Sequence, residues 1–166
     1  TGVDMAKMKI EVMHHYHAKH GWSLKDKLIA SLPRYARWGA LFSPLLNLHG
    51  LLPGTAWLGE QLAGFHRQRS LPKWSGNPFR SVEAGTWPLG QDGKDVVLFA
   101  DTFNTAFEPG ILRASLKVLT AAGYRVHAVE AGGRPLCCGR TYLSVGMVDK
   151  ARAEAEREHL RTLLNE

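Results

Sequence analysis

The sequence predicts an α/β protein in which an N-terminal helical region precedes an incomplete parallel α/β unit. Apolar side chains recur every three or four residues through much of residues 1–65, as on the buried face of a helix. Two segments of strand type, the apolar run 95–100 and residues 125–130, flank a further helical pattern. The 166 residues are 45% hydrophobic and 22% charged, which is typical of a globular domain and excludes collagen, coiled coil and wholesale disorder.

The N-terminal region is expected to contain about four helices. Asp4 can cap a first helix that ends before Gly21. Ser23 can open a second helix that ends or kinks at Pro33. The remaining two helical stretches are expected at residues 35–45 and 55–65.

An uncharged stretch of 22 residues, from Trp38 to Gly59, lies within this region. Its length would permit a membrane span, but Pro44 and Pro53, together with several glycine and polar residues, divide it into pieces of one or two helical turns. We therefore expect no transmembrane span. Burial between helices and contact with a membrane surface both remain open for this stretch.

Residues 66–94 are expected to form an irregular linker, because they contain three prolines, four glycines and no periodicity. This divides the chain into a helical region (1–65), the linker (66–94) and an α/β region (95–166).

The α/β region is predicted to contain one βαβ unit, whose crossover should be right-handed. A strand at 95–100 is followed by a loop at 101–108, a helix from Pro109 to about Ala122, and a strand at 125–130. A glycine loop and a last helix over about 141–164 follow. Two strands alone form a marginal sheet, and the chain starts at Thr1, so we expect it to be a piece of a longer protein.

Charge and cysteine content narrow the function classes. The net charge of +6 arises in residues 1–94, which hold 12 basic and 6 acidic residues, whereas residues 95–166 hold nine of each. The basic residues are scattered and never form a run, so we expect no nucleic-acid partner. The two cysteines are adjacent, which excludes a disulfide-scaffold protein.

Cys137, Cys138 and Gly139 form the strongest candidate site. They follow the second predicted strand, at the sheet edge where α/β proteins gather ligands. Two consecutive thiolates can reach different irons of one cluster, and Gly139 would let the backbone come close without a Cβ atom. The alternative is that both thiols are small buried side chains without a ligand.

Four histidines in the first helix, His14, His15, His17 and His20, form a second candidate. Pairs spaced by three residues share a helix face and could bind zinc or copper. No further ligand completes such a site in the sequence, so packing of this helix end against another module is the preferred interpretation.

The segment VVLFADTFNTAFEPGILRASLKVLTAAGYRVHAVEAGGRPLCCGRTYLSVG (residues 96–146) resembles the first half of a cysteine-rich CCG domain. That domain occurs in iron–sulfur oxidoreductases such as the glycolate oxidase iron–sulfur subunit and the cysteine-rich subunit of heterodisulfide reductase. The start of the chain, TGVDMAKMKIEVMHHYHAKHG, resembles the run that follows a ferredoxin-type module. The match is closest to FAD-linked D-2-hydroxyacid dehydrogenases of the D-lactate or D-2-hydroxyglutarate type.

This resemblance implies that the chain is the electron-relay region of a flavin-dependent oxidoreductase. The region by itself would not catalyse the reaction. Cys137 and Cys138 would be ligands of an iron–sulfur cluster of the 4Fe-4S type, and FAD would lie in a domain outside this chain. FAD and ferredoxin-like domains of the same polypeptide would be its partners, with a quinone or carrier protein as electron acceptor. A cytoplasmic location, or one at the periphery of the inner membrane, is expected.

The chain departs from the family pattern at one ligand position. The family places a cysteine at the end of the first strand, where this chain has Thr102, and a further C-x-x-C downstream of the pair. Threonine is a poor iron ligand, and a 4Fe-4S cluster normally takes four thiolates. The alternative is therefore a metal-free, degenerate CCG module that docks domains or binds a partner.

Overall fold

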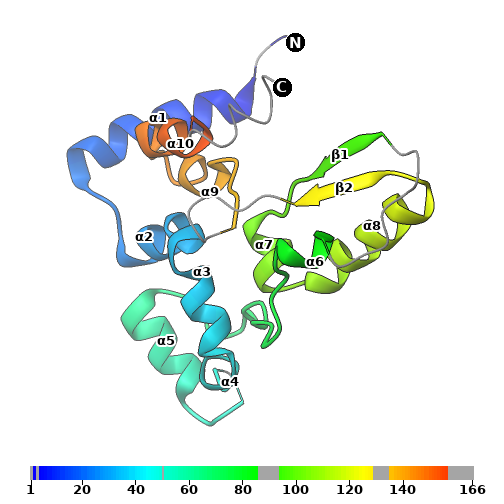
Figure 1. Cartoon of the computed structure of the whole chain (residues 1–166). Helices are drawn as coiled ribbons and strands as arrows, with labels where there is room; N and C mark the ends of the chain where they lie inside the picture. The colour runs from blue at the N-terminus through cyan, green and yellow to red at the C-terminus, as the bar shows by residue number, and fades with distance from the viewer. Residues whose placement is uncertain (1, 3, 50, 86–93, 129–134, 157–166) are drawn as a thin grey trace.

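The computed structural model describes residues 2, 4–49, 51–85, 94–128 and 135–156, and Figure 1 shows the arrangement of the elements. The elements are, in chain order, α1 (Met5–His20), α2 (Leu24–Ala30), α3 (Leu32–Leu41), α4 (Ser43–Leu46), α5 (Thr55–Ala63), α6 (Val82–Gly85), β1 (Asp95–Leu98), α7 (Thr102–Ala106), α8 (Pro109–Ala121), β2 (Arg125–Ala128), α9 (Arg140–Leu143) and α10 (Val148–Ala155). The predicted fold class is confirmed, because a helical region precedes a parallel strand pair.

The first helices begin and end where their capping residues predict. The Asp4 carboxylate accepts a hydrogen bond from the Lys7 backbone at the start of α1, and Gly21 follows its last residue with φ +81°. Ser23 and Asp26 form a reciprocal capping box at the start of α2. The local sequence therefore determines both helix starts.

β1 and β2 form a parallel pair with Asp95 opposite Arg125 and Leu98 opposite Ala128. The crossover helix α8 turns its apolar face toward the sheet. The buried residues of the resulting core are Phe79, Ala84, Ala100, Leu112, Leu116 and Val126. Pro109 begins α8, as predicted. The predicted residues 129–130 of the second strand lie outside the described residues.

Two expectations for the α/β region were wrong. Residues 101–108 contain α7, because the Asp101 carboxylate caps its N-terminus by accepting hydrogen bonds from the backbones of Phe103 and Asn104. The last predicted helix is interrupted between α9 and α10, where Gly146 adopts φ +74°. A Cβ at Gly146 would lie 2.7 Å from the backbone nitrogen of His14, so packing against α1 accounts for this break.

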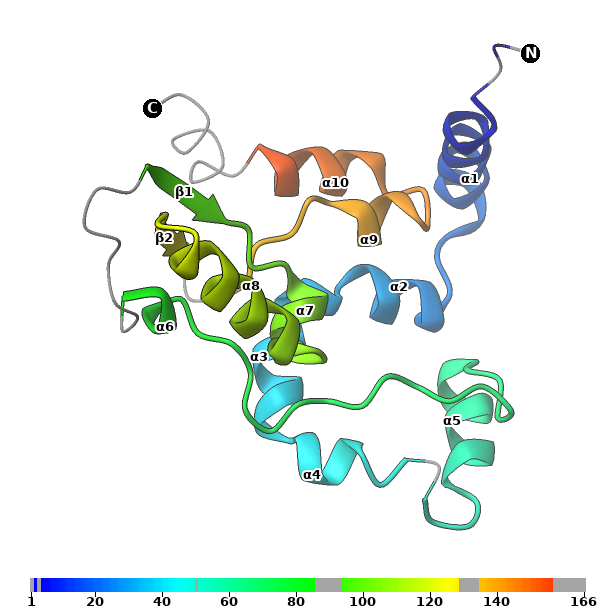
Figure 2. The same cartoon turned by 90° about the vertical axis from the view of Figure 1, so that its right-hand side faces the viewer.

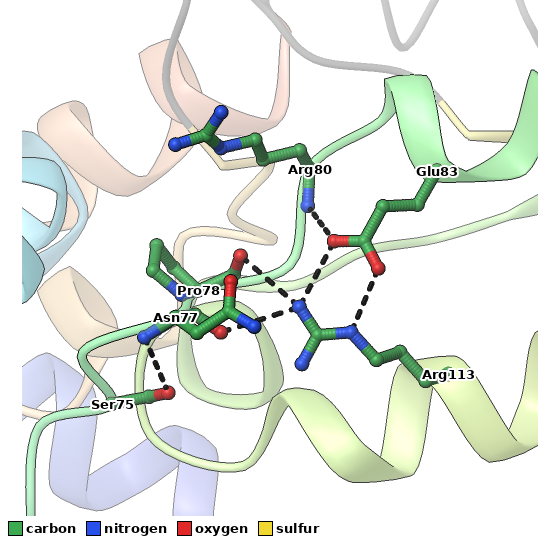
Figure 3. Close-up of polar contacts among 6 residues, drawn as sticks. All are labelled: Ser75, Asn77, Pro78, Arg80, Glu83 and Arg113. Atoms are coloured by element: carbon green, nitrogen blue, oxygen red, sulfur yellow. Dashed lines mark hydrogen bonds and ion pairs between the residues drawn. The ribbon is translucent and has the colours of Figure 1, made fainter. Parts of the chain in front are cut away.

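Residues 74–85 of the predicted linker pack against the α/β region, with the Ser75 and Phe79 amides donating to the Ala106 and Thr105 carbonyls. Phe79 is buried in its core, and α6 contacts β2. Figure 3 shows the main polar attachment, in which the Arg113 guanidinium on α8 donates to both carboxylate oxygens of Glu83 at 2.7 and 3.0 Å. The same guanidinium donates to the carbonyls of Asn77 and Pro78 at 3.3 and 3.4 Å.

The N-terminal helices also pack against the chain that follows the second strand. The Trp22 indole donates to the Val145 carbonyl at 2.9 Å, and His14 Nδ1 lies 3.0 Å from the Gly146 carbonyl oxygen. Ala30 at the end of α2 shares a core with Tyr142, Met147 and others from α9 and α10. Figures 1 and 2 show α1 and α2 beside α9 and α10.

Among the described residues, no helix is both long enough and apolar enough to cross a membrane. The α3–α5 region in particular is divided into three helices of ten residues or fewer. The expectation of no transmembrane span therefore agrees with the helix lengths.

Candidate functional site

The Cys137–Cys138 pair lies at the carboxyl edge of the strand pair. Beyond the ends of β1 and β2, Asp101 forms an isolated parallel bridge with Leu136, which brings these two segments of the chain together. This places the cysteines directly next to the start of α7. Edges of this kind are where α/β proteins gather their ligands.

Thr102 lies against the backbone immediately before the cysteines. Its amide and its hydroxyl both donate to the Leu136 carbonyl, each at 3.1 Å, and its side chain is buried. The resemblance matches Thr102 to a cysteine of the family. The structure places Thr102 beside Leu136, the residue before Cys137, although the two are 34 positions apart in the chain.

The two thiols occupy different environments. Cys137 is 6% exposed, and its Sγ atom lies 3.9 Å from the Thr141 hydroxyl oxygen. Cys138 is exposed. An exposed thiol can bind a metal or react with a reagent directly, whereas the buried one must first be uncovered.

Gly139 has a conformation that excludes other residues. Its φ is +80°, and a Cβ atom there would lie 2.6 Å from the Ala151 carbonyl oxygen on α10. Close packing of α10 over the loop is therefore a structural reason for glycine at this position. The following helix α9 has only four residues.

The described residues supply no complete metal site. No group of three or more histidine, cysteine, aspartate or glutamate side chains gathers in the described part of the chain. Two thiolates with threonine beside them do not make the four-thiolate set of a 4Fe-4S cluster. A cluster here would need further ligands from outside these residues.

The histidines of α1 engage other groups. His14 Nδ1 pairs with the Gly146 carbonyl, and His17 Nδ1 lies 2.7 Å from the Gly21 carbonyl oxygen while its ring stacks on Trp22. His15 lies 3.5 Å from Glu11 on the exposed face. These contacts agree with the interpretation that the end of this helix packs against another part of the protein.

Sequence reasoning missed a groove between α3 and residues 76–82, with a volume of about 740 Å³. Phe79 and Pro135 line it, together with the two basic residues Arg37 and Arg80. Figure 3 shows the Arg80 guanidinium directed away from Glu83, whose carboxylate accepts a hydrogen bond from the Arg80 backbone amide at 2.9 Å. No sequence signal marks this groove, because it forms between segments that are far apart in the chain, from Ala36 on α3 to Pro135.

Comparison with known proteins gives no assignment: no family model, curated protein or solved structure matches this chain.

Proposed function

We propose that this chain is the electron-relay region of a flavin-dependent D-2-hydroxyacid oxidoreductase, with Cys137 and Cys138 as iron–sulfur ligands. One observation carries the proposal. The fold brings Thr102, which stands at the family's upstream ligand position, against the residue that precedes the cysteine pair. The three positions that the resemblance matches to cysteines of the family thus lie close together at the sheet edge where a ligand site is expected, which supports the proposal.

In this proposal the described residues hold one side of a cluster. Cys138 is the accessible ligand, and Cys137 joins it once its contact with Thr141 opens. A bound 4Fe-4S cluster would supply one-electron chemistry, and its remaining thiolates would come from outside these residues. FAD in another domain would oxidise the substrate, and a quinone or carrier protein would receive the electrons, in the cytoplasm or at the inner membrane's periphery.

A metal-free docking module is the second candidate. The Thr102 hydroxyl is already satisfied by the Leu136 carbonyl, and Cys137 is packed beside Thr141. Both observations describe a site that is stable without a ligand, in which the thiols are side chains of a packed loop.

Iron and acid-labile sulfide content distinguish the two candidates. The polypeptide that contains this chain would be reconstituted anaerobically, and its visible spectrum compared with those of Cys137→Ser and Cys138→Ser. Ala122→Ser is the matched control, because Ala122 is exposed and precedes β2 at the opposite end of that strand. The relay proposal expects each cysteine variant to lose iron and thiolate-to-iron absorbance while the control keeps both. Unchanged iron in both cysteine variants would overturn it in favour of the docking module.

Thr102→Cys provides an independent gain-of-ligand test. Cysteine is close to threonine in size, so it fits the buried position and adds a third thiol beside the pair. The relay proposal expects iron in this variant to resist a chelator longer than in the unsubstituted protein. Thr120→Cys, which adds a thiol on α8, is the control and should not change that resistance. Equal chelator sensitivity of all three proteins contradicts a shared site at residues 102, 137 and 138.

A further inference from the structure

The helices α3 to α5 present a large apolar surface that the described residues leave uncovered. We call it the α3–α5 apolar surface; its members are 49% to 71% exposed and comprise Trp38, Leu41, Phe42, Leu45, Leu51, Leu52, Trp57, Leu58 and Leu62. Isolated exposed leucines are common on proteins, but nine large apolar residues within 25 positions are not. Such a concentration marks an interaction site.

Helix α5 shows most clearly that a partner is missing. Its sequence TAWLGEQLA is mostly apolar, yet it contains no buried residue. An apolar helix is normally buried against other elements. Figures 1 and 2 show α4 and α5 at one end of the molecule, away from the strand pair and from α10. The part of the surface on α4 and α5 therefore lies away from the strand pair, whereas Trp38 and Leu41 on α3 line the groove that Pro135 also borders.

The charged residues near this surface in the sequence are mainly basic. Residues 38–59 carry no acidic or basic side chain, whereas residues 32–73 contain five lysines and arginines and one acid, a net charge of +4. The single acid, Glu60, lies 3.9 Å from His66 and 3.8 Å from Arg67, so its charge has basic neighbours. Arg37, which precedes Trp38 on α3, and Arg69 and Lys73, which follow α5 in the chain, are exposed.

We propose that the α3–α5 apolar surface binds peripherally to a membrane that contains anionic lipids. Leucine, phenylalanine and tryptophan side chains would enter the boundary between headgroups and acyl chains, and the exposed basic residues would contact lipid phosphates. The indoles of Trp38 and Trp57 make no hydrogen bond among the described residues, and tryptophan favours that boundary. A protein partner would be expected to meet a rim that presents charges of both signs, whereas the single acid of residues 32–73, Glu60, already has basic neighbours.

Vesicle co-sedimentation of the full-length protein tests the proposal. Vesicles of phosphatidylcholine alone are compared with vesicles that also contain phosphatidylglycerol, and binding is expected only to the anionic ones. Each basic residue near such a surface contributes about 1 kcal/mol, so Arg69→Gln and Lys73→Gln should each weaken binding about fivefold. Binding of the unsubstituted protein to the anionic vesicles should also be lost at high salt.

Leu62→Glu tests the apolar contact, with Val118→Glu as its matched control. Both residues lie on helices and are equally exposed, at 66% and 67%, so neither substitution disturbs the core. Leu62→Glu should reduce vesicle binding at least about tenfold, and Val118→Glu should leave it unchanged. Quenching of tryptophan fluorescence by brominated lipid should decrease in Trp57→Phe.

Two results would overturn the proposal. One is the absence of binding to anionic vesicles by the unsubstituted protein. The other is a dimer, detected by light scattering, that Leu62→Glu converts to a monomer without changing vesicle binding. A second copy of the chain would then be the partner that covers the surface. Neither result bears on iron content, so this proposal and the relay proposal can fail separately.

Discussion

At the scale of single residues, Tyr142 is the least expected feature of the structure. It is 1% exposed, and its hydroxyl has no hydrogen-bond partner among the described residues. Its ring packs with Ala30 and Met147 in the core that joins the two ends of the chain, and the Arg34 guanidinium lies 5.9 Å from the ring centroid. The ring therefore contributes packing, whereas burial of the hydroxyl carries a desolvation cost.

We predict that Tyr142→Phe raises the free energy of unfolding by about 1 kcal/mol, because it removes a buried polar group that has no partner among the described residues. Urea denaturation measures this change. Tyr35→Phe is the matched control: the Tyr35 hydroxyl donates to the Leu28 carbonyl at 3.0 Å, so its removal should lower stability by about 1 kcal/mol. A loss of stability in Tyr142→Phe would show that its hydroxyl is satisfied.

The residues of the candidate site were predictable only in part. The position of Cys137 and Cys138 after the second strand follows from the local sequence. The burial of Cys137 and the exposure of Cys138 do not, because they depend on contacts with Thr141 and α10. The proximity of Thr102 to the pair depends on the parallel pairing of two segments distant in sequence.

At the scale of elements, helices with strong caps were predictable and short ones were not. α1 and α8 begin at Asp4 and Pro109, residues that act through local chemistry. α7 has five residues, too few to show a period, so the sequence pattern after Asp101 does not distinguish this helix from a loop. The break at Gly146 is imposed by α1, more than 130 residues earlier, and no local pattern reports it.

The attachment of α6 to α8 predicts a pH dependence of stability. The hydrogen bond from Arg113 holds the pKa of the Glu83 carboxyl below its ordinary value of 4.5. A carboxyl whose pKa is lowered by folding stabilises the protein above the unfolded pKa and loses that contribution as the pH falls through the folded pKa. Stability should therefore fall on acidification below about pH 5.

Glu83→Gln should lower the free energy of unfolding by about 1 to 2 kcal/mol at neutral pH and flatten its dependence on acid. Denaturant titrations over a pH series measure both effects. Arg113→Lys keeps the charge but loses the paired geometry, so it should retain part of the stability. If the stability of Glu83→Gln fell as steeply with acidification as that of the unsubstituted protein, other carboxylates would be responsible for the pH dependence.

At the scale of the whole molecule, the first helices and the cysteine loop are expected to unfold together. Ala30, Tyr142 and Met147 share a core, and Trp22 is bonded to Val145 across 123 positions of the chain. Cys137 is buried beside this core, whereas Cys138 is exposed. The two thiols therefore report different events in the metal-free protein.

We predict that a thiol reagent labels Cys138 at once and Cys137 slowly, on opening of the structure. Trp22→Phe removes the bond to Val145, worth about 1 kcal/mol, and should speed labelling of Cys137 about fivefold. Mass spectrometry of labelled peptides measures both rates. Trp38→Phe is the control, because its indole is exposed. An unchanged Cys137 rate in Trp22→Phe would mean that the two segments open independently.

The contact between His14 and Gly146 has a consequence during synthesis on the ribosome. The two residues are 132 positions apart, so α1 leaves the exit tunnel long before its partner exists. At translation rates of about 5–20 residues per second, this delay lasts roughly 7 to 26 seconds. Throughout it α1 lacks the residues that it packs against, so the nascent chain is expected to stay incompletely folded until Gly146 has emerged.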